Sequence, residues 1–75
     1  MIDNTEVGRR IGAYLKLTGR KNTWFGERMG WNHDKTSTVL NGKRQLGLVE
    51  FFKACDVLEV SPEQFITRDD IREKA

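Results

Sequence analysis

The chain has 75 residues, a single cysteine and a formal net charge of +2. A domain of this size buries only about 60% of the surface of its unfolded chain, and one cysteine excludes a disulfide within the chain. No apolar stretch approaches the roughly 20 residues that cross a bilayer, and the first residues lack the apolar run of a signal peptide. We therefore expect one domain over residues 1–75, a cytoplasmic location and no membrane partner.

The charges are unevenly distributed along the chain. Residues 1–45 contain nine Lys and Arg against four Asp and Glu, a balance of +5, whereas residues 46–75 contain four against seven, a balance of −3. A basic half and an acidic half predict one side that faces a polyanion and another that is turned away from it. Ordinary scatter of charge in a small charged domain is the alternative.

The first predicted helix follows an apolar periodicity between residues 7 and 15. Its cap is Asn4 or Thr5, and Gly19 ends it. Gly8 and Gly12 lie four residues apart on one face, where each glycine destabilises a helix by roughly 1 kcal/mol relative to alanine. This spacing predicts that another backbone segment approaches the helix closely at these two positions.

The second and third predicted helices are short and joined by a turn at Gly30. Asn22 or Thr23 caps the second helix, and Asn32 caps the third, which covers about residues 33–41. Two short helices joined by a glycine-containing turn form a unit that can place its second helix in a DNA major groove. The sequence therefore favours a helix-turn-helix over this segment.

The C-terminal part predicts a fourth helix from about Gly47 to Glu59 and a short fifth helix. The fifth begins at Ser61–Gln64, because Ser, Pro and Gln at this spacing form a capping box. Residues 67–70 can start a further short helix, so the core covers about residues 5–67 and residues 68–75 form a tail. The residues expected on the buried face of the fourth helix are Leu48, Phe51, Phe52, Cys55 and Leu58.

In this order the helices resemble the Cro/phage-repressor-type helix-turn-helix family, also called the XRE family. The resemblance extends from about Val7 to Ile66 without gaps. It implies a compact, all-α, five-helix, lambda-repressor-like domain that regulates transcription as a repressor or Cro-like protein and binds a palindromic operator as a homodimer. The positions that carry it include the Arg10-Ile11 pair, Gly26, Gly30 and the Asn41-Gly42-Lys43 segment.

Four residues depart from the pattern of the family. Asn22 replaces a common Gln, Thr36 replaces a branched apolar residue, and Trp24 replaces a polar residue. Leu40 stands where some relatives have an acid that pairs with an arginine of the first helix. Arg10 is therefore expected to lack that partner.

The third helix is the predicted reading helix. Thr36, Val39 and Leu40 are spaced at i, i+3 and i+4 and should face inward, so the opposite face points outward. The first residues of such a helix reach base edges. Asp34 has two readings, because its carboxylate either accepts from a cytosine amine or lies favourably at the positive end of the helix dipole. The residues predicted to contact bases are His33, Asp34, Lys35, Ser37 and Thr38.

A second set of residues is predicted to contact phosphates on both sides of the reading helix. The start of the second helix offers free backbone N–H groups, and basic and amide side chains follow the third helix. Such contacts position a protein on DNA without reading the sequence. For each lysine alone, a solvated charge is the alternative. The predicted phosphate contacts are Lys21, Asn22, Thr23, Asn41, Lys43, Arg44 and Gln45.

Some apolar residues stand at positions that we expect to be exposed. Leu46 and Val49, together with Ile71 of the tail, are predicted to form the interface of a homodimer. Trp24 supports a rival hypothesis, a protein-interaction module of the same fold such as an antitoxin-like partner or adaptor. The lone Cys55 is expected to be buried. No Cys/His set or phosphate loop indicates an enzyme, and neither a metal nor a cofactor is expected.

Overall fold

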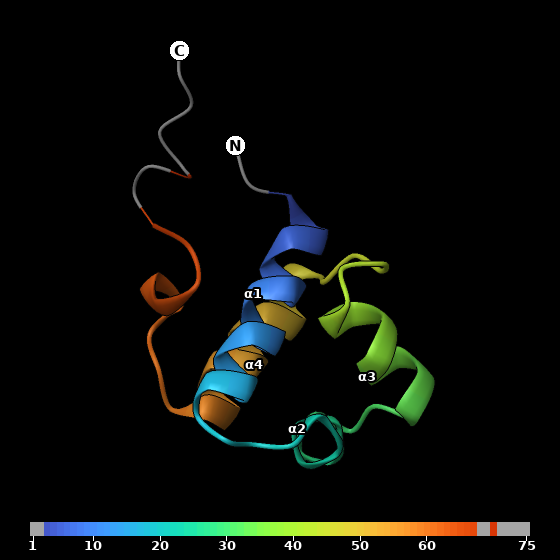
Figure 1. The fold of residues 1–75 in the computed structure, drawn as a ribbon. Coiled ribbons are helices and arrows are strands. Elements are labelled where there is room, and N and C mark those ends of the chain that lie inside the picture. Colours follow the sequence, from blue (N-terminus) through green and yellow to red (C-terminus); the bar gives the residue numbers. More distant parts are fainter. Residues whose placement is uncertain (1–2, 68–69, 71–75) are drawn as a thin grey trace.

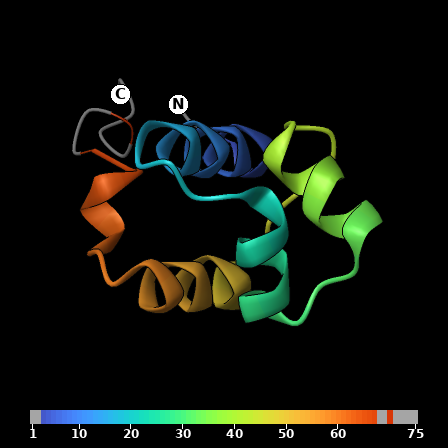
Figure 2. The ribbon, with the colours of Figure 1, turned by 60° about the horizontal axis from the view of Figure 1, so that its bottom comes forward.

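A computed structural model describes residues 3–67 and Asp70. In this part of the chain there are four α-helices, a 3₁₀ turn and no strand, which confirms the predicted all-α class. Helices α1 and α4 lie on opposite sides of the core, α2 and η1 close its two ends, and α3 packs outside against α1 and α2 (Figures 1 and 2). The elements are α1 (Asn4–Leu17), α2 (Asn22–Met29), α3 (His33–Leu40), α4 (Leu48–Leu58) and η1 (Pro62–Gln64).

Helix α1 is capped by Asp3 rather than by Asn4 or Thr5. The Asp3 carboxylate accepts hydrogen bonds from the backbone N–H groups of Thr5 at 3.1 Å and Glu6 at 2.9 Å. The Thr5 hydroxyl, followed by the Glu6 N–H, lowers the pKa of this carboxyl below its usual value. The cap prediction is wrong because Asp3 has the extended backbone and the acceptor that a cap requires, whereas Asn4 and Thr5 lie inside the helix.

Gly8 and Gly12 bring α1 and α3 into close contact. A Cβ atom on Gly12 would lie 2.9 Å from the carbonyl oxygen of Leu40, and one on Gly8 would collide with the carbonyl oxygen of Val39. Both obstacles are backbone atoms, which cannot rotate out of the way as a side chain can. The predicted close approach is confirmed, and it fixes α3 against α1.

The turn between α2 and α3 contains a glycine in the left-handed conformation and a tryptophan that packs against the core. Gly30 has φ +78°, a conformation in which glycine is not strained. The Trp31 ring meets the Phe25 ring nearly edge-on, with 5.7 Å between centroids. The Asn32 side chain accepts a hydrogen bond from the Lys35 N–H at 2.8 Å. This confirms the predicted Asn32 cap and the start of α3.

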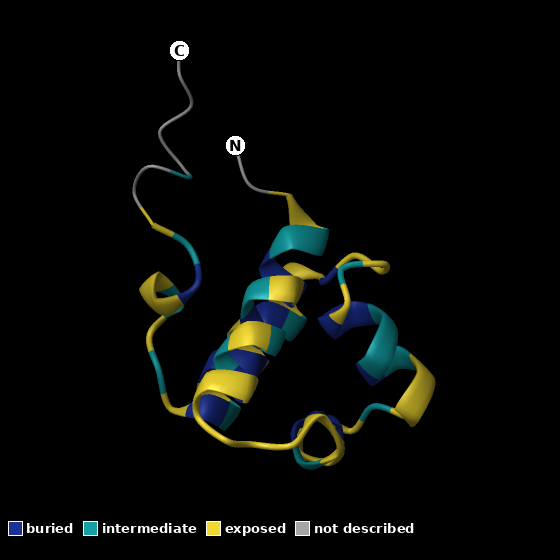
Figure 3. Cartoon of the chain, in the orientation of Figure 1, coloured by how far each residue is buried: buried dark blue, intermediate teal, exposed yellow. Residues whose placement is uncertain are grey.

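The core lies between α1 and α4, and its residues occupy the inner faces of the helices (Figure 3). Cys55 is buried as predicted, and burial raises the pKa of its thiol. Phe52 is 49% exposed, so its predicted burial is wrong. The largest fully buried side chains are Phe25, Ile11, Leu15 and Val39.

At the start of α4, the structure buries a different leucine from the one that the sequence predicts. Leu46 is 3% exposed, whereas Leu48 is 70% exposed. The Leu46 N–H donates to the carbonyl oxygen of Asn4 at 3.4 Å, which ties the segment before α4 to the start of α1. Gly47 then occupies the cap position, and its N–H donates to the Glu50 carboxylate at 3.1 Å. The helical period therefore begins after Leu46, and the predicted exposure of Leu46 and burial of Leu48 are wrong.

The predicted fifth helix is reduced to the 3₁₀ turn η1. Ser61 makes no side-chain capping bond, and the Phe65 ring packs against Tyr14 and Phe51, with centroid separations of 5.5 and 6.4 Å. The carbonyl oxygen of Phe65 accepts a hydrogen bond from Arg10 Nη1 at 2.8 Å. In a longer helix this carbonyl oxygen would accept a hydrogen bond from a backbone N–H of the same helix. Here it accepts from a side chain of α1 instead. The five-helix prediction is wrong for the described residues.

Arg10 obtains an acid partner from the C-terminal segment instead of from the position of Leu40. Its Nη1 and Nη2 atoms donate to the Asp70 carboxylate at 2.8 and 3.3 Å. Asp70 also accepts from the Thr67 N–H at 2.8 Å, and its own N–H donates to Thr67 Oγ1 at 3.3 Å. The Arg10 guanidinium, followed by the Thr67 N–H, holds the pKa of Asp70 well below its usual range. Apart from Asp70, the predicted tail over residues 68–75 lies outside the described residues.

None of the helices in the described part of the chain combines the length and the apolar character that a membrane span requires.

Candidate nucleic-acid interface

The inner face of α3 is fixed by packing against α1 and α2. Thr36, Val39 and Leu40 are all buried, which confirms the predicted inward stripe. The Thr36 hydroxyl donates to the carbonyl oxygen of Asn32 at 2.8 Å, so no polar atom is left unsatisfied there. A Cβ atom on Gly26 would collide with the Thr36 side chain, so this pair sets how closely α2 and α3 cross.

The outer face of α3 holds four of the five residues predicted to contact bases. His33 and Asp34 are exposed, and Ser37 and Thr38 are half-buried. Thr38 Oγ1 donates to the carbonyl oxygen of Asp34 at 2.9 Å. Because its proton is used within the helix, the methyl group of Thr38 is the part left for an apolar contact. Asn41 Nδ2 donates to Ser37 Oγ at 3.3 Å, which connects the face to the end of α3.

Lys35, the fifth predicted base contact, is held apart from the other four. Its Nζ atom is hydrogen-bonded to the Glu50 carboxylate on α4 and lies 5.2 Å from the centroid of the Trp31 ring. The Lys35 ammonium, and to a smaller extent the Gly47 N–H, lower the pKa of Glu50. To contact a base, Lys35 would have to leave this acid.

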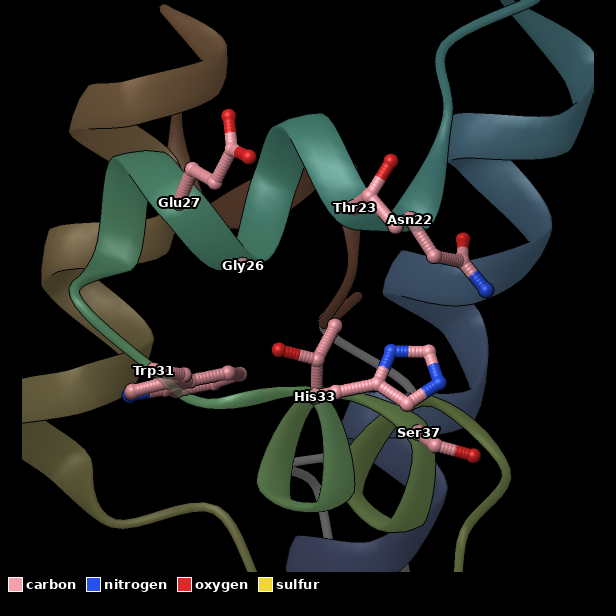
Figure 4. A pocket seen from close by; sticks show the side chains of 8 residues that line it. Asn22, Thr23, Gly26, Glu27, Trp31, His33 and Ser37 are labelled. Carbon is pink, nitrogen blue, oxygen red and sulfur yellow. The ribbon is translucent and has the colours of Figure 1, made fainter.

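A cleft of about 230 Å³ separates the start of α2 from the start of α3 (Figure 4). Trp31 lies deep between the two helices, and the Asn22 side chain and the His33 ring are on the same side of the opening. The cleft thus places a predicted phosphate contact next to a predicted base contact. Its lining residues are Asn22, Thr23, Gly26, Glu27, Trp31, His33, Thr36 and Ser37.

The start of α2 is open to solvent. Lys21 occupies the cap position without a side-chain hydrogen bond, and Asn22 and Thr23 are the first two helical residues. The predicted cap at Asn22 or Thr23 is therefore wrong. All three residues are exposed, and the first N–H groups of a helix favour an anion.

The predicted phosphate contacts after α3 are also exposed. Gly42 has φ +76° and ends the helix as a left-handed residue. In the described part of the chain, neither Lys21 at α2 nor Lys43 and Arg44 after α3 is ion-paired with an acid. The residues of this set that follow α3 are Asn41, Lys43, Arg44 and Gln45.

The structure changes the candidate dimer surface. Leu46 is buried and cannot contribute an exposed contact, whereas Val49 is 81% exposed. Leu48 and Phe52 are exposed with it on the first two turns of α4, although the apolar period predicted both to be buried. Ile71 lies outside the described residues. The apolar surface is therefore centred on α4.

Trp24 is half-buried and has partners within the chain. The Arg20 and Arg28 guanidinium carbons lie 5.3 and 5.4 Å from the centroid of its ring. Cation–π contacts at these distances are attractive. The indole therefore packs with two arginines on its own chain.

A second groove, of about 480 Å³, contains cations that the sequence reasoning did not assign to a site. It runs between α1, the start of α2 and the end of α3. Its α1 side carries Arg9 and Lys16, with the small residues Gly12 and Ala13 between them, and Arg20 lines it from the segment between α1 and α2. Arg9 and Lys16 are seven residues apart and share one face of α1, and that spacing is the signal that could have identified them.

Comparisons with known protein families, with curated proteins and with solved structures find no match to this chain. Among the residues that the structure describes, no group of three or more His, Cys, Asp or Glu is placed to hold a metal ion. The interpretation of the interface rests on its geometry and charge.

Proposed function

We propose that this protein is a sequence-specific regulator that binds double-stranded DNA, of the Cro/phage-repressor (XRE) type, with α3 in the major groove. The observation that carries the proposal is the two-sided character of α3. Its inner residues are locked against α1 and α2, while His33 and Asp34 are exposed at its start. A helix held rigidly with polar groups at its outer N-terminal end is suited to reading base edges.

The charges around α3 support the same proposal. Lys21 lies at the start of α2, and Lys43 and Arg44 follow α3. Cations that have no ion pair with the described residues therefore stand at both ends of the reading face. Contacts with phosphates from two sides fix the register of a helix in the groove. The location of such a regulator would be cytoplasmic and associated with the nucleoid, and the exposed α4 surface would serve a homodimer on a palindrome.

The proposal is tested by selecting binding sites from a random pool of DNA duplexes and then comparing His33→Ala with Lys43→Ala. His33→Ala should lower affinity for the selected duplex much more than for random duplexes, because base contacts carry the sequence information. Lys43→Ala should weaken both kinds of duplex alike and reduce the slope of log affinity against log salt by about 0.9. Lys53→Ala on α4 is the charge-matched control.

Two outcomes would contradict the proposal. One is the absence of any enriched sequence together with an affinity for DNA that does not change with salt. The other is an equal loss on selected and random duplexes for His33→Ala. Circular dichroism of each variant separates these outcomes from unfolding.

The contacts of Trp24 do not favour the rival hypothesis of a protein-interaction module. A half-exposed tryptophan without neighbours would need an external partner to explain it. Here Arg20 and Arg28 contact the ring, so packing within the chain accounts for the residue.

A further inference from the structure

We propose that the groove lined by Arg9, Lys16 and Arg20 binds the phosphate backbone of the same DNA duplex that α3 reads. This inference rests on the proposed function and adds a backbone contact on α1. The groove lies between α1, the start of α2 and the end of α3, whose places in the fold are seen in Figure 1.

The charge of the groove fits a polyanion. Three of its lining residues are cations, and the described residues that line it include no carboxylate. Among the three cations of the groove, Glu6 pairs with Arg9, at 3.4 Å between exposed groups, and an exposed pair of this kind is weak. Lys16 and Arg20 have no ion pair within the described ranges.

The opposite wall of the groove belongs to the candidate interface. Asn22 from the start of α2 and Asn41 from the end of α3 both line it, and both are predicted phosphate contacts. The Arg9 guanidinium lies over Gly42, since a Cβ atom there would be 2.7 Å from Arg9 Nη2. The groove is thus continuous with the α3–α4 loop at one end and with the start of α2 at the other.

The dimensions of α1 fit a stretch of backbone. The seven residue steps from Arg9 to Lys16 rise about 10 Å along the helix, at about 1.5 Å per residue. Successive phosphates of one strand rise about 3.4 Å along the axis of the duplex, and the strand also winds around that axis. Two cations about 10 Å apart can therefore contact different phosphates of one strand. Ala13 lies between the two cations, is exposed and has a short side chain, so it leaves room for a strand to approach, whereas the space beside Gly12 is filled by Leu40.

The test compares two double variants of the full chain with the same change in net charge. Lys16→Gln/Arg20→Gln removes two cations of the groove, and Arg28→Gln/Lys53→Gln removes two that do not line it. Each double variant also removes one of the two arginines that contact Trp24, so that effect is matched. Dissociation constants for the selected duplex and a random duplex are measured between 50 and 200 mM salt.

We expect Lys16→Gln/Arg20→Gln to bind both duplexes more weakly and to prefer the same sequence as the wild type. If two phosphate contacts are lost, the slope of log affinity against log salt should become shallower by about 1.8. The loss of affinity over the fourfold rise in salt should then be about tenfold smaller than for the wild type. The control variant should keep the wild-type slope.

A second measurement locates the contact. Single methylphosphonate linkages remove one backbone charge at a time from the selected duplex. A methylphosphonate at a linkage that contacts the groove should lower the affinity of the wild type. The same linkage should not lower the affinity of Lys16→Gln/Arg20→Gln further, because that variant has already lost the contact.

Equal salt slopes for the two double variants would overturn the inference while leaving the proposed function intact. A wild-type protein that binds no DNA would overturn both. Circular dichroism confirms that the variants are folded.

Discussion

The two sides of α1 use their charges in opposite ways. On one side, Arg10 is bound to Asp70, to Glu6 and to the carbonyl oxygen of Phe65. On the other side, Lys16 has no acid partner in the described part of the chain and lines an open groove with Arg9. Adjacent arginines of one helix therefore belong to different environments.

We infer from this difference that the 75-residue chain separates the residues that stabilise its fold from those that we propose to bind DNA. The side of α1 toward η1 satisfies its charged and aromatic groups internally, as the Tyr14–Phe65 contact also shows. The side toward α2 and α3 leaves cations and amides at the surface. Substitutions on the side toward η1 should change the free energy of unfolding. Substitutions on the side toward α2 and α3 should change the affinity for DNA.

The largest effect is expected at Phe65, which anchors the stabilising side. Phe65→Ala removes a buried ring that contacts Tyr14 and Phe51 and should lower the free energy of unfolding by about 3–5 kcal/mol. Urea denaturation measures this loss. If it is smaller than about 1 kcal/mol, the C-terminal segment does not have the structural role assigned to it here.

A smaller effect is expected where the two sides meet, at Gly8. Gly8→Ala places a methyl group against the carbonyl oxygen of Val39. Overpacking of this kind costs about 1–3 kcal/mol and outweighs the gain in helix propensity of up to about 1 kcal/mol. Thermal unfolding should show a lower Tm than the wild type, whereas the exposed Lys16→Ala should change stability by less than about 0.5 kcal/mol. A raised Tm for Gly8→Ala would show that α3 can move away from α1.

The smallest effect is expected at Asp70 and depends on pH. Its pKa is lowered in the folded protein, so the ion pair adds stability above the usual carboxyl range and loses it as pH falls below about 4. Asp70→Asn should therefore destabilise the protein at pH 7, and the difference from the wild type should shrink at pH 3. Urea denaturation at both values measures this, with Glu27→Gln as control. A difference that is the same at both values would show that the pair with Arg10 does not form in solution.

Local signals were sufficient to predict much of the fold. Apolar periodicity predicted α1 and α4, and cap and turn residues predicted α2 and α3. The Asn32 cap and the Gly30 turn were placed correctly because cap and turn chemistry depends on neighbouring residues. The close approach at Gly8 was also predictable, since a helix contains glycine at a cost. The inward stripe of α3 followed from its helical spacing alone.

Two cap predictions, for α1 and α2, were wrong by one or two residues, since several neighbouring residues could serve as the cap. The larger errors arose where contacts between distant residues decide the outcome. Leu46 is buried because its segment is bonded to Asn4, and the fifth helix is cut short because Phe65 packs on α1. Nothing near Arg10 in the sequence indicates that Asp70 is its partner. The basic groove was missed for a similar reason, because Lys16 and Asn41 are brought together only by the crossing of α1 and α3.

The contact between Arg10 and Asp70 also bears on the order of folding. The two residues are 60 positions apart, so almost the entire chain lies in the loop that this contact closes. Closing a loop is entropically more costly the longer it is, and contacts between distant positions slow folding. During synthesis the contact forms only after Asp70 has left the ribosome, when α1 to α4 have already emerged. We therefore expect the contact between Arg10 and Asp70 to form late, after α1 to α4 have packed together.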